Sequence, residues 1–170
     1  MTTDFVHNKV GDSTASGLEP VLIGFKVRLW NEKGWIPDAS FTTQLRFPNL
    51  ASKDLQTEHL APRLLLHFKH SVTEKFNLGY NIGTEWDGFI PEPTFMYMLS
   101  PKFKLSDKFE CYIEAFGRLP QHAKAEHWTD VGLMYLVTKN IQLELSGGYE
   151  LTSQNSYHRY YQLLGLAFRI

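Results

Sequence analysis

IQLELSGGYEL, residues 141–151, alternates between two kinds of side chain from one position to the next. Its odd positions are mostly apolar, and its even positions are polar or glycine. Because successive side chains of a β-strand point to opposite faces, this alternation is typical of a strand with one apolar and one polar face. The segment 160–170 repeats the pattern, with Leu164 and Leu166 on one face and Gly165 on the other.

The same alternation recurs along most of the chain, and no long segment shows a helical period. No apolar run approaches the roughly 20 residues that a membrane-spanning helix needs. The alternation therefore predicts an all-β chain of about 9–10 strands. Residues 2–8 are expected to be the tail of one further strand. The other predicted strands cover 18–30, 35–47, 61–70, 75–86, 94–104, 108–118 and 127–138.

The connections between these strands alternate in length. Short turns are predicted at 31–34, 71–74, 105–107 and 139–140, and longer loops at 48–60, 87–93, 119–126 and 152–157. Short turns on one rim and long loops on the other are typical of an up-and-down outer-membrane β-barrel. In that topology the short turns and Ile170 would be periplasmic, and the long loops extracellular. We expect 1–170 to form a single antiparallel β-barrel domain.

Composition narrows the function classes. Lys and Arg number 17 against 18 Asp and Glu, which argues against a nucleic-acid-binding protein, since that would carry a basic face. Cys111 is the one cysteine, so no internal disulfide is possible. The first residues lack the basic and apolar regions of an export signal. We therefore expect the chain to be the C-terminal part of a barrel whose signal and first strands are missing.

The polar face of the predicted strands carries most of the charge. If the apolar face meets outer-membrane lipid, the charged side chains line the interior, where water or ion pairs offset the cost of burying them. Basic residues dominate this face up to residue 69 and acidic residues dominate afterwards. The predicted lumen-lining residues, forming a solute path or a salt-bridge network, are Lys26, Arg28, Asp38, Arg46, Arg63, Lys69, Glu85, Glu110, Glu114, Asp130, Glu144 and Arg169.

Two alternatives stay open at this point. The lumen could be plugged, with Glu110 and Glu114 paired to basic residues such as Arg28, Arg46, Arg63 or Lys69. A soluble lipocalin-like barrel would instead reverse the faces and put the apolar side chains inside. The polar face is rich in glycine, which suits a tight lumen or β-bulges, and Trp30 and Trp35 flank a short turn, where an interfacial aromatic belt would lie. Both observations favour the membrane barrel.

The chain resembles a family of outer-membrane barrels described as transporters and named for a pathway of phenol meta-degradation. The resemblance covers about 17–170, and it implies a barrel of about a dozen strands with a signal peptide. It supplies no substrate. The segments that carry it are Gly24–Arg28, Pro37–Phe41, Leu78–Gly83, Trp128–Gly132, Gln142–Gly147 and Gly165–Ile170.

Catalytic and metal-binding patterns are weak. The serines of the predicted strands lack a glycine-rich elbow and a recognisable histidine partner. His67 and His70 are three residues apart, which places them on opposite faces of a strand, while His122 and His127 belong to a loop region. We therefore expect no enzyme, no cofactor and no metal. The predicted function is a porin-like channel or transporter for small solutes in a Gram-negative outer membrane.

Overall fold

The computed structural model describes residues 5–10, 13–152 and 159–168. Within them, nine strands form one antiparallel sheet in the order β11-β10-β9-β8-β7-β6-β5-β4-β3, so each strand pairs with its neighbours in sequence. No helix among the described residues is long and apolar enough to cross a membrane. The strands of this sheet are β3 (Leu22–Trp30), β4 (Asp38–Arg46), β5 (Ala61–Thr73), β6 (Phe76–Glu85), β7 (Thr94–Lys104), β8 (Phe109–Leu119), β9 (Glu126–Thr138), β10 (Ile141–Glu150) and β11 (Tyr160–Phe168).

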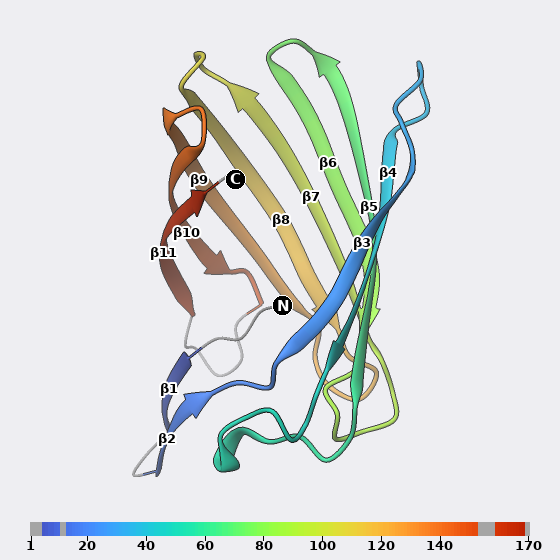
Figure 1. Ribbon diagram of the computed structural model, residues 1–170, viewed down its shortest axis with the longest axis vertical. Helices are drawn as coiled ribbons and strands as arrows, with labels where there is room; N and C mark the ends of the chain where they lie inside the picture. The colour runs from blue at the N-terminus through green and yellow to red at the C-terminus, as the bar shows by residue number, and fades with distance from the viewer. Residues whose placement is uncertain (1–4, 11–12, 153–158, 169–170) are drawn as a thin grey trace.

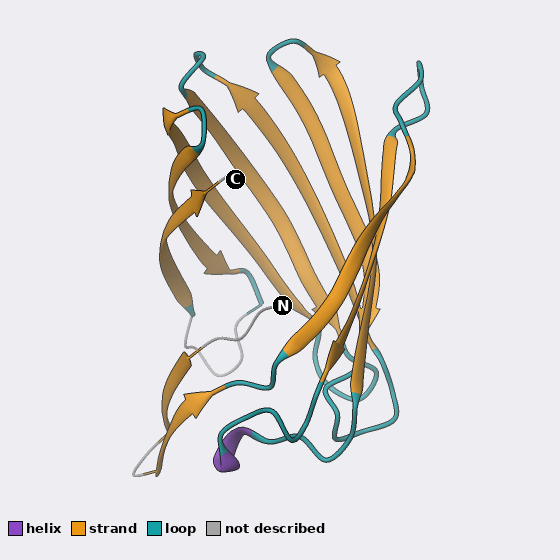
Figure 2. Cartoon of the chain, in the orientation of Figure 1, coloured by secondary structure: helices purple, strands orange, loops and turns teal. Residues whose placement is uncertain are grey.

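The prediction of an all-β, up-and-down antiparallel fold is confirmed. The sheet curls strongly, with β3 at one side and β11 at the other (Figure 1). Closure is not reached among the described residues, because β3 and β11 do not pair, so the sheet is a partial barrel. The connections also follow the predicted rule, with short turns at one rim and long loops at the other (Figure 2). We call these the short-turn rim and the long-loop rim.

The predicted first strand is wrong in its placement. Residues 2–8 were expected to join the barrel, but β1 (Phe5–Val10) pairs with β2 (Ser13–Leu18) in a separate two-stranded sheet. Residues 2–4 lie outside the described part. The hairpin is joined to the long-loop rim, where the short 3-10 helix η1 (Lys53–Leu55) lies, since the N–H of Leu18 donates to Ser52 Oγ at 2.9 Å.

Two prolines explain why two strands begin later than predicted. The strand predicted over 18–30 begins only at Leu22, because Pro20 has no N–H to donate to a ladder. The strand predicted over 35–47 begins at Asp38, directly after Pro37. The residues before Pro37 form a tight turn in which Gly34 has a φ of 58°, a conformation that favours glycine.

Glu32 joins two short turns. The backbone N–H of Ser71, near the end of β5, donates to its carboxylate at 2.7 Å. This hydrogen bond, helped by nearby His70 and Lys69, holds the pKa of Glu32 below its ordinary value of 4.5. Since the folded pKa is the lower one, the stabilisation by Glu32 is present above the unfolded pKa and is lost as the pH falls through the folded pKa.

We therefore expect Glu32→Gln to unfold at a lower urea concentration than the parent at about pH 7, and at the same concentration at about pH 2. Urea unfolding of both proteins at the two pH values measures this. An equal difference at both pH values would show that the charge of Glu32 is not responsible.

Candidate functional site

One face of the nine-stranded sheet is polar, and we call it the inner face. The strand register places the predicted lumen-lining residues together on this face, except Arg169, which lies outside the described residues. Glu85 and Asp130 of this face are buried, whereas Val131 and Leu145 of the opposite, outer face are each 60% exposed. The polar side chains therefore lie on the enclosed side of the curled sheet.

Two arginines of the inner face lie on either side of Glu85 near the long-loop rim. Arg63 Nε lies 3.6 Å from Glu85 Oε2, and Arg118 forms an ion pair with Glu85 Oε1 from the other side. The Glu85 side chain is only 11% exposed, so this carboxylate is held between two guanidinium groups that are partly open to solvent. Two charges thus stabilise a buried third that would be costly alone.

These side chains line a pocket of about 320 Å³, which we call the arginine pocket. Five strands, β4 to β8, contribute to it. Its polar lining consists mainly of Arg46, Arg63, Asn81, Glu85 and Arg118, and its apolar lining mainly of Leu65, Met96, Met98 and Phe116.

Two acidic residues of the inner face, Glu114 on β8 and Glu144 on β10, accept hydrogen bonds from hydroxyl groups. Ser100 Oγ donates to Glu114 Oε1 at 2.7 Å, and the hydroxyl of Tyr112 donates to Glu144 Oε1. Tyr112 lies on β8 and Glu144 on β10, so the tyrosine crosses the intervening strand β9 at Gly132. A Cβ at Gly132 would overlap the tyrosine ring.

A second tyrosine repeats this arrangement from the other direction. Tyr161 of β11 crosses β10 at Gly148 and donates its hydroxyl to Asp130 Oδ2 on β9. A Cβ at Gly148 would overlap the ring of Tyr161. The glycine-rich polar face thus accommodates rings at these two positions, and the ladder irregularities lie elsewhere, near Arg28, Ser71 and Ile141.

The predicted pairing of Glu110 and Glu114 with Arg28, Arg46, Arg63 or Lys69 is wrong for the described residues. Arg63 pairs with Glu85, and Arg28 lies 3.9 Å from Asp38 at the short-turn rim. Lys26, Arg46, Lys69 and Glu110 make no ion pair within the described part of the chain. The reason is topological: β3–β5 and β8–β10 are separated by β6 and β7 in the sheet, so neighbouring strands supply the partners instead.

Arg159 forms ion pairs with two acidic residues, Glu126 and Glu150, at the long-loop rim. Its Nε lies 2.6 Å from Glu150 Oε2, and a terminal nitrogen lies 2.8 Å from Glu126 Oε1. Its guanidinium carbon also sits 5.3 Å from the ring centre of Trp128, a cation–π contact. The ion pairs around Glu85 and those around Arg159 are therefore two separate networks on the inner face.

The histidines do not converge. His67 faces inward, with Nε2 at 2.9 Å from Thr42 Oγ1 and Nδ1 at 3.0 Å from Asn81 Oδ1, while His70 contacts Tyr80 on the outer face. Among the described residues no group of three or more His, Cys, Asp and Glu is arranged to hold a metal ion. His127 Nδ1 is hydrogen-bonded to the Tyr97 hydroxyl at 2.6 Å, away from any acidic cluster.

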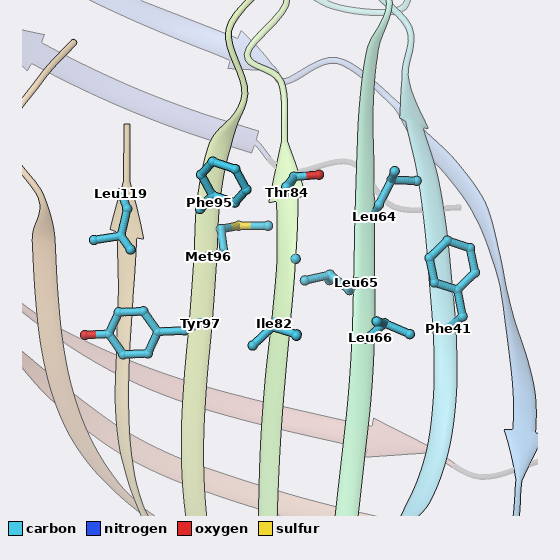
Figure 3. A pocket seen from close by; sticks show the side chains of 11 residues that line it. Phe41, Leu64, Leu65, Leu66, Ile82, Thr84, Phe95, Met96, Tyr97 and Leu119 are labelled. Atoms are coloured by element: carbon cyan, nitrogen blue, oxygen red, sulfur yellow. The ribbon is translucent and has the colours of Figure 1, made fainter. Parts of the chain in front are cut away.

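The outer face is apolar over a wide area. Phe25 is 66% exposed and Leu164 is 81% exposed, although both belong to the central part of a strand. A shallow apolar groove of about 510 Å³ runs across β4–β8 on this face. Figure 3 shows side chains of Phe41, Leu64 and Ile82 from three neighbouring strands along it.

Aromatic rings stack in pairs on the outer face towards the short-turn rim. Phe76 stacks on Phe103 with ring centres 4.9 Å apart, and Phe109 stacks on Tyr135 at 4.7 Å. Trp35, in the turn before β4, is 97% exposed. Aromatic belts near the rim are a feature of outer-membrane barrels.

The family described as "Putative MetA-pathway of phenol degradation" matches residues 1–170. The chain belongs to this family. The name links the family to phenol degradation, in agreement with the resemblance found in the sequence. No curated protein matches the chain.

Several residues of this phenol-degradation family member escaped the sequence analysis. Arg118 lies on the same strand face as Glu110 and Glu114, so alternation alone placed it on the inner face. Tyr112 and Tyr161 are aromatic residues at polar positions, each opposite a glycine in register. That combination of tyrosine and facing glycine was the available signal.

Proposed function

We propose that the chain forms the wall of an outer-membrane β-barrel that conducts small solutes through its charged interior. The observation that carries this proposal is the distribution of exposure: large apolar side chains of the outer face are exposed, whereas Glu85, Asp130 and Glu150 of the inner face are buried. Lipid is the solvent that favours such an outer face, and water or ions favour such an inner one. The soluble lipocalin-like alternative requires the reverse distribution.

The family description supports a role connected with phenol degradation. We propose that the conducted solutes are small aromatic compounds of that kind, since the inner face offers aromatic side chains as well as charges. Passage needs binding that is weak enough to release the solute. The proposal involves no catalysis and no cofactor, and it places the protein in the outer membrane as a single barrel domain.

The first experiment is refolding of the purified 170-residue chain with and without detergent. We expect a β-rich, monodisperse and heat-modifiable species only with detergent, because the exposed apolar face would aggregate in water. The measurements are circular dichroism, size-exclusion chromatography and gel mobility with and without boiling. A folded, monodisperse chain in plain buffer would contradict a lipid-facing outer surface.

The second experiment separates an open channel from a plugged barrel. The plugged alternative is favoured by the side-chain bonds that cross the inner face, such as Tyr112 to Glu144 and Arg118 to Glu85. In planar bilayers we expect single-channel currents, and we expect Arg28→Gln with Arg46→Gln to shift ion selectivity towards cations. The absence of current from correctly refolded protein would favour the plugged barrel.

A further inference from the structure

The arginine pocket carries an excess of positive charge. Three guanidinium groups, those of Arg46, Arg63 and Arg118, share it with the single carboxylate of Glu85. Arg46 has no carboxylate partner among the described residues. Two positive charges in the pocket lining are therefore not neutralised by the lining itself, which makes the pocket attractive to an anion.

Arg63 also has an unused donor. Its Nε atom is buried and has no hydrogen-bond partner among the described residues, because Glu85 Oε2 lies beyond hydrogen-bond range at 3.6 Å. Because this atom is buried against Glu85, the exposed part of the Arg63 side chain, which is 37% open to solvent, is what can meet a solute in the pocket. Guanidinium groups present planar, forked donors that match carboxylate oxygens.

The rest of the lining is apolar. Leu65, Met96, Met98 and Phe116 project from three different strands to the same pocket. A strongly hydrated inorganic anion gains little from such a wall, whereas a compact hydrocarbon or aromatic body is buried against it. Methionine and phenylalanine are also suited to contact with an aromatic ring. The volume of about 320 Å³ lies at the small end of the range for ligand sites.

We propose that the arginine pocket binds a small monocarboxylate with a compact apolar body, of which benzoate is the simplest probe. The carboxylate is held by the guanidinium groups of Arg46 and Arg63, with Arg118 nearby, and the apolar body lies against Met96, Met98 and Phe116. The inference deepens the proposed function, on which it rests, by naming the class of solute that the interior selects.

The position of the pocket fits this role. Arg46 and Glu85 are the last residues of β4 and β6, and Arg118 is next to last in β8, so the pocket lies at the long-loop rim. The loops there contact each other, since the N–H groups of Glu58 and His59 both donate to the carbonyl of Gly88. Glu110, Glu114 and Glu144 lie further along their strands from this rim, so a solute that enters here meets the arginine pocket before it meets those carboxylates.

The test is equilibrium dialysis of radiolabelled benzoate against the full chain refolded in a neutral detergent. We expect saturable binding of benzoate. Acetate, inorganic phosphate and neutral phenol should displace benzoate only at concentrations at least about tenfold higher than unlabelled benzoate needs, because each lacks either the carboxylate or the apolar body. Arg46→Gln removes a charge without breaking an ion pair, and we expect it to weaken benzoate binding about tenfold or more.

The matched control is Lys69→Gln, which removes a charge from the same face but lies six residues beyond Arg63 along β5, roughly 20 Å away. We expect it to leave benzoate affinity within about twofold of the parent, a much smaller change than the tenfold loss expected for Arg46→Gln. Arg118→Gln provides a second pocket variant, expected to weaken binding in the same direction as Arg46→Gln.

Two results would overturn the inference: benzoate affinity unchanged in both Arg46→Gln and Arg118→Gln, or phenol binding as tightly as benzoate. These outcomes are distinct from failure of the proposed function, which planar-bilayer conductance of simple salts measures on the same preparation. A conducting protein that ignores benzoate would contradict the carboxylate site alone. A protein that binds benzoate and carries no current would contradict the channel alone.

Discussion

Replacement of Gly148 by alanine is expected to lower the free energy of unfolding by about 3 kcal/mol, and the same change at Gly147 by less than about 0.5 kcal/mol. The two glycines are adjacent on β10 but face opposite ways. A Cβ at Gly148 would overlap the ring of Tyr161, whereas a Cβ at Gly147 would make ordinary contact, 3.5 Å from the nearest atom, Tyr161 O.

The cost at Gly148 has two parts. Moving the ring disturbs its packing, and it breaks the hydrogen bond from the tyrosine hydroxyl to Asp130. Asp130 is buried, and its other carboxylate oxygen already has no hydrogen-bond partner among the described residues. Each unsatisfied buried group of this kind costs about 1–3 kcal/mol.

Urea unfolding in detergent, followed by tryptophan fluorescence, measures both glycine variants against the parent. Tyr161→Ala and the double variant with Gly148→Ala complete a double-mutant cycle. We expect the alanine at Gly148 to cost much less once the ring has been removed. If Gly148→Ala were as costly without the ring as with it, the overlap with Tyr161 would not be the cause.

Glu85→Gln is expected to cost about 2 kcal/mol of unfolding free energy, because it leaves two guanidinium groups facing each other without the charge between them. A fully buried pair that loses one partner costs about 3–5 kcal/mol, and the smaller figure reflects the solvent that reaches the arginines. The arginine side chains are 37% exposed at Arg63 and 52% exposed at Arg118.

Asp107→Asn is the matched control for this variant. Asp107 pairs with Lys104 at 2.8 Å, yet its side chain is 97% exposed. An exposed ion pair contributes about 0–1 kcal/mol, so the control should unfold almost as the parent does. Equal effects of the two substitutions in urea unfolding would contradict a special role for the enclosed carboxylate of Glu85.

Strand alternation was enough to predict most of the fold from the sequence. The side-chain period of two assigned each predicted residue to a face, and the register places Lys26, Glu85 and Glu144 on the same face as expected. The bounds failed where prolines interrupt the ladder, at Pro20 and Pro37. Alternation says nothing about hydrogen-bonding donors, which is why these two ends were misplaced.

The partners of the charges could not be predicted in the same way. Alternation assigns a face but gives no distance between strands, so Arg63 was as plausible a partner for Glu114 as for Glu85. Register decides this question, since Arg63 lies directly opposite Glu85 across the β5–β6 ladder. Arg118 was missed because its role depends on β6 and β8 approaching the same point from either side of β7.

The tyrosines that cross a glycine also bear on assembly. A strand that slips by one residue exposes its apolar side chains to the interior and is rejected for that reason. A slip by two residues restores the faces, so hydrophobicity cannot detect it. It would, however, place Tyr161 opposite Ser146 or Glu150 in place of Gly148, where a side chain obstructs the ring. The glycine positions thus help to specify the register in which the last strands pair.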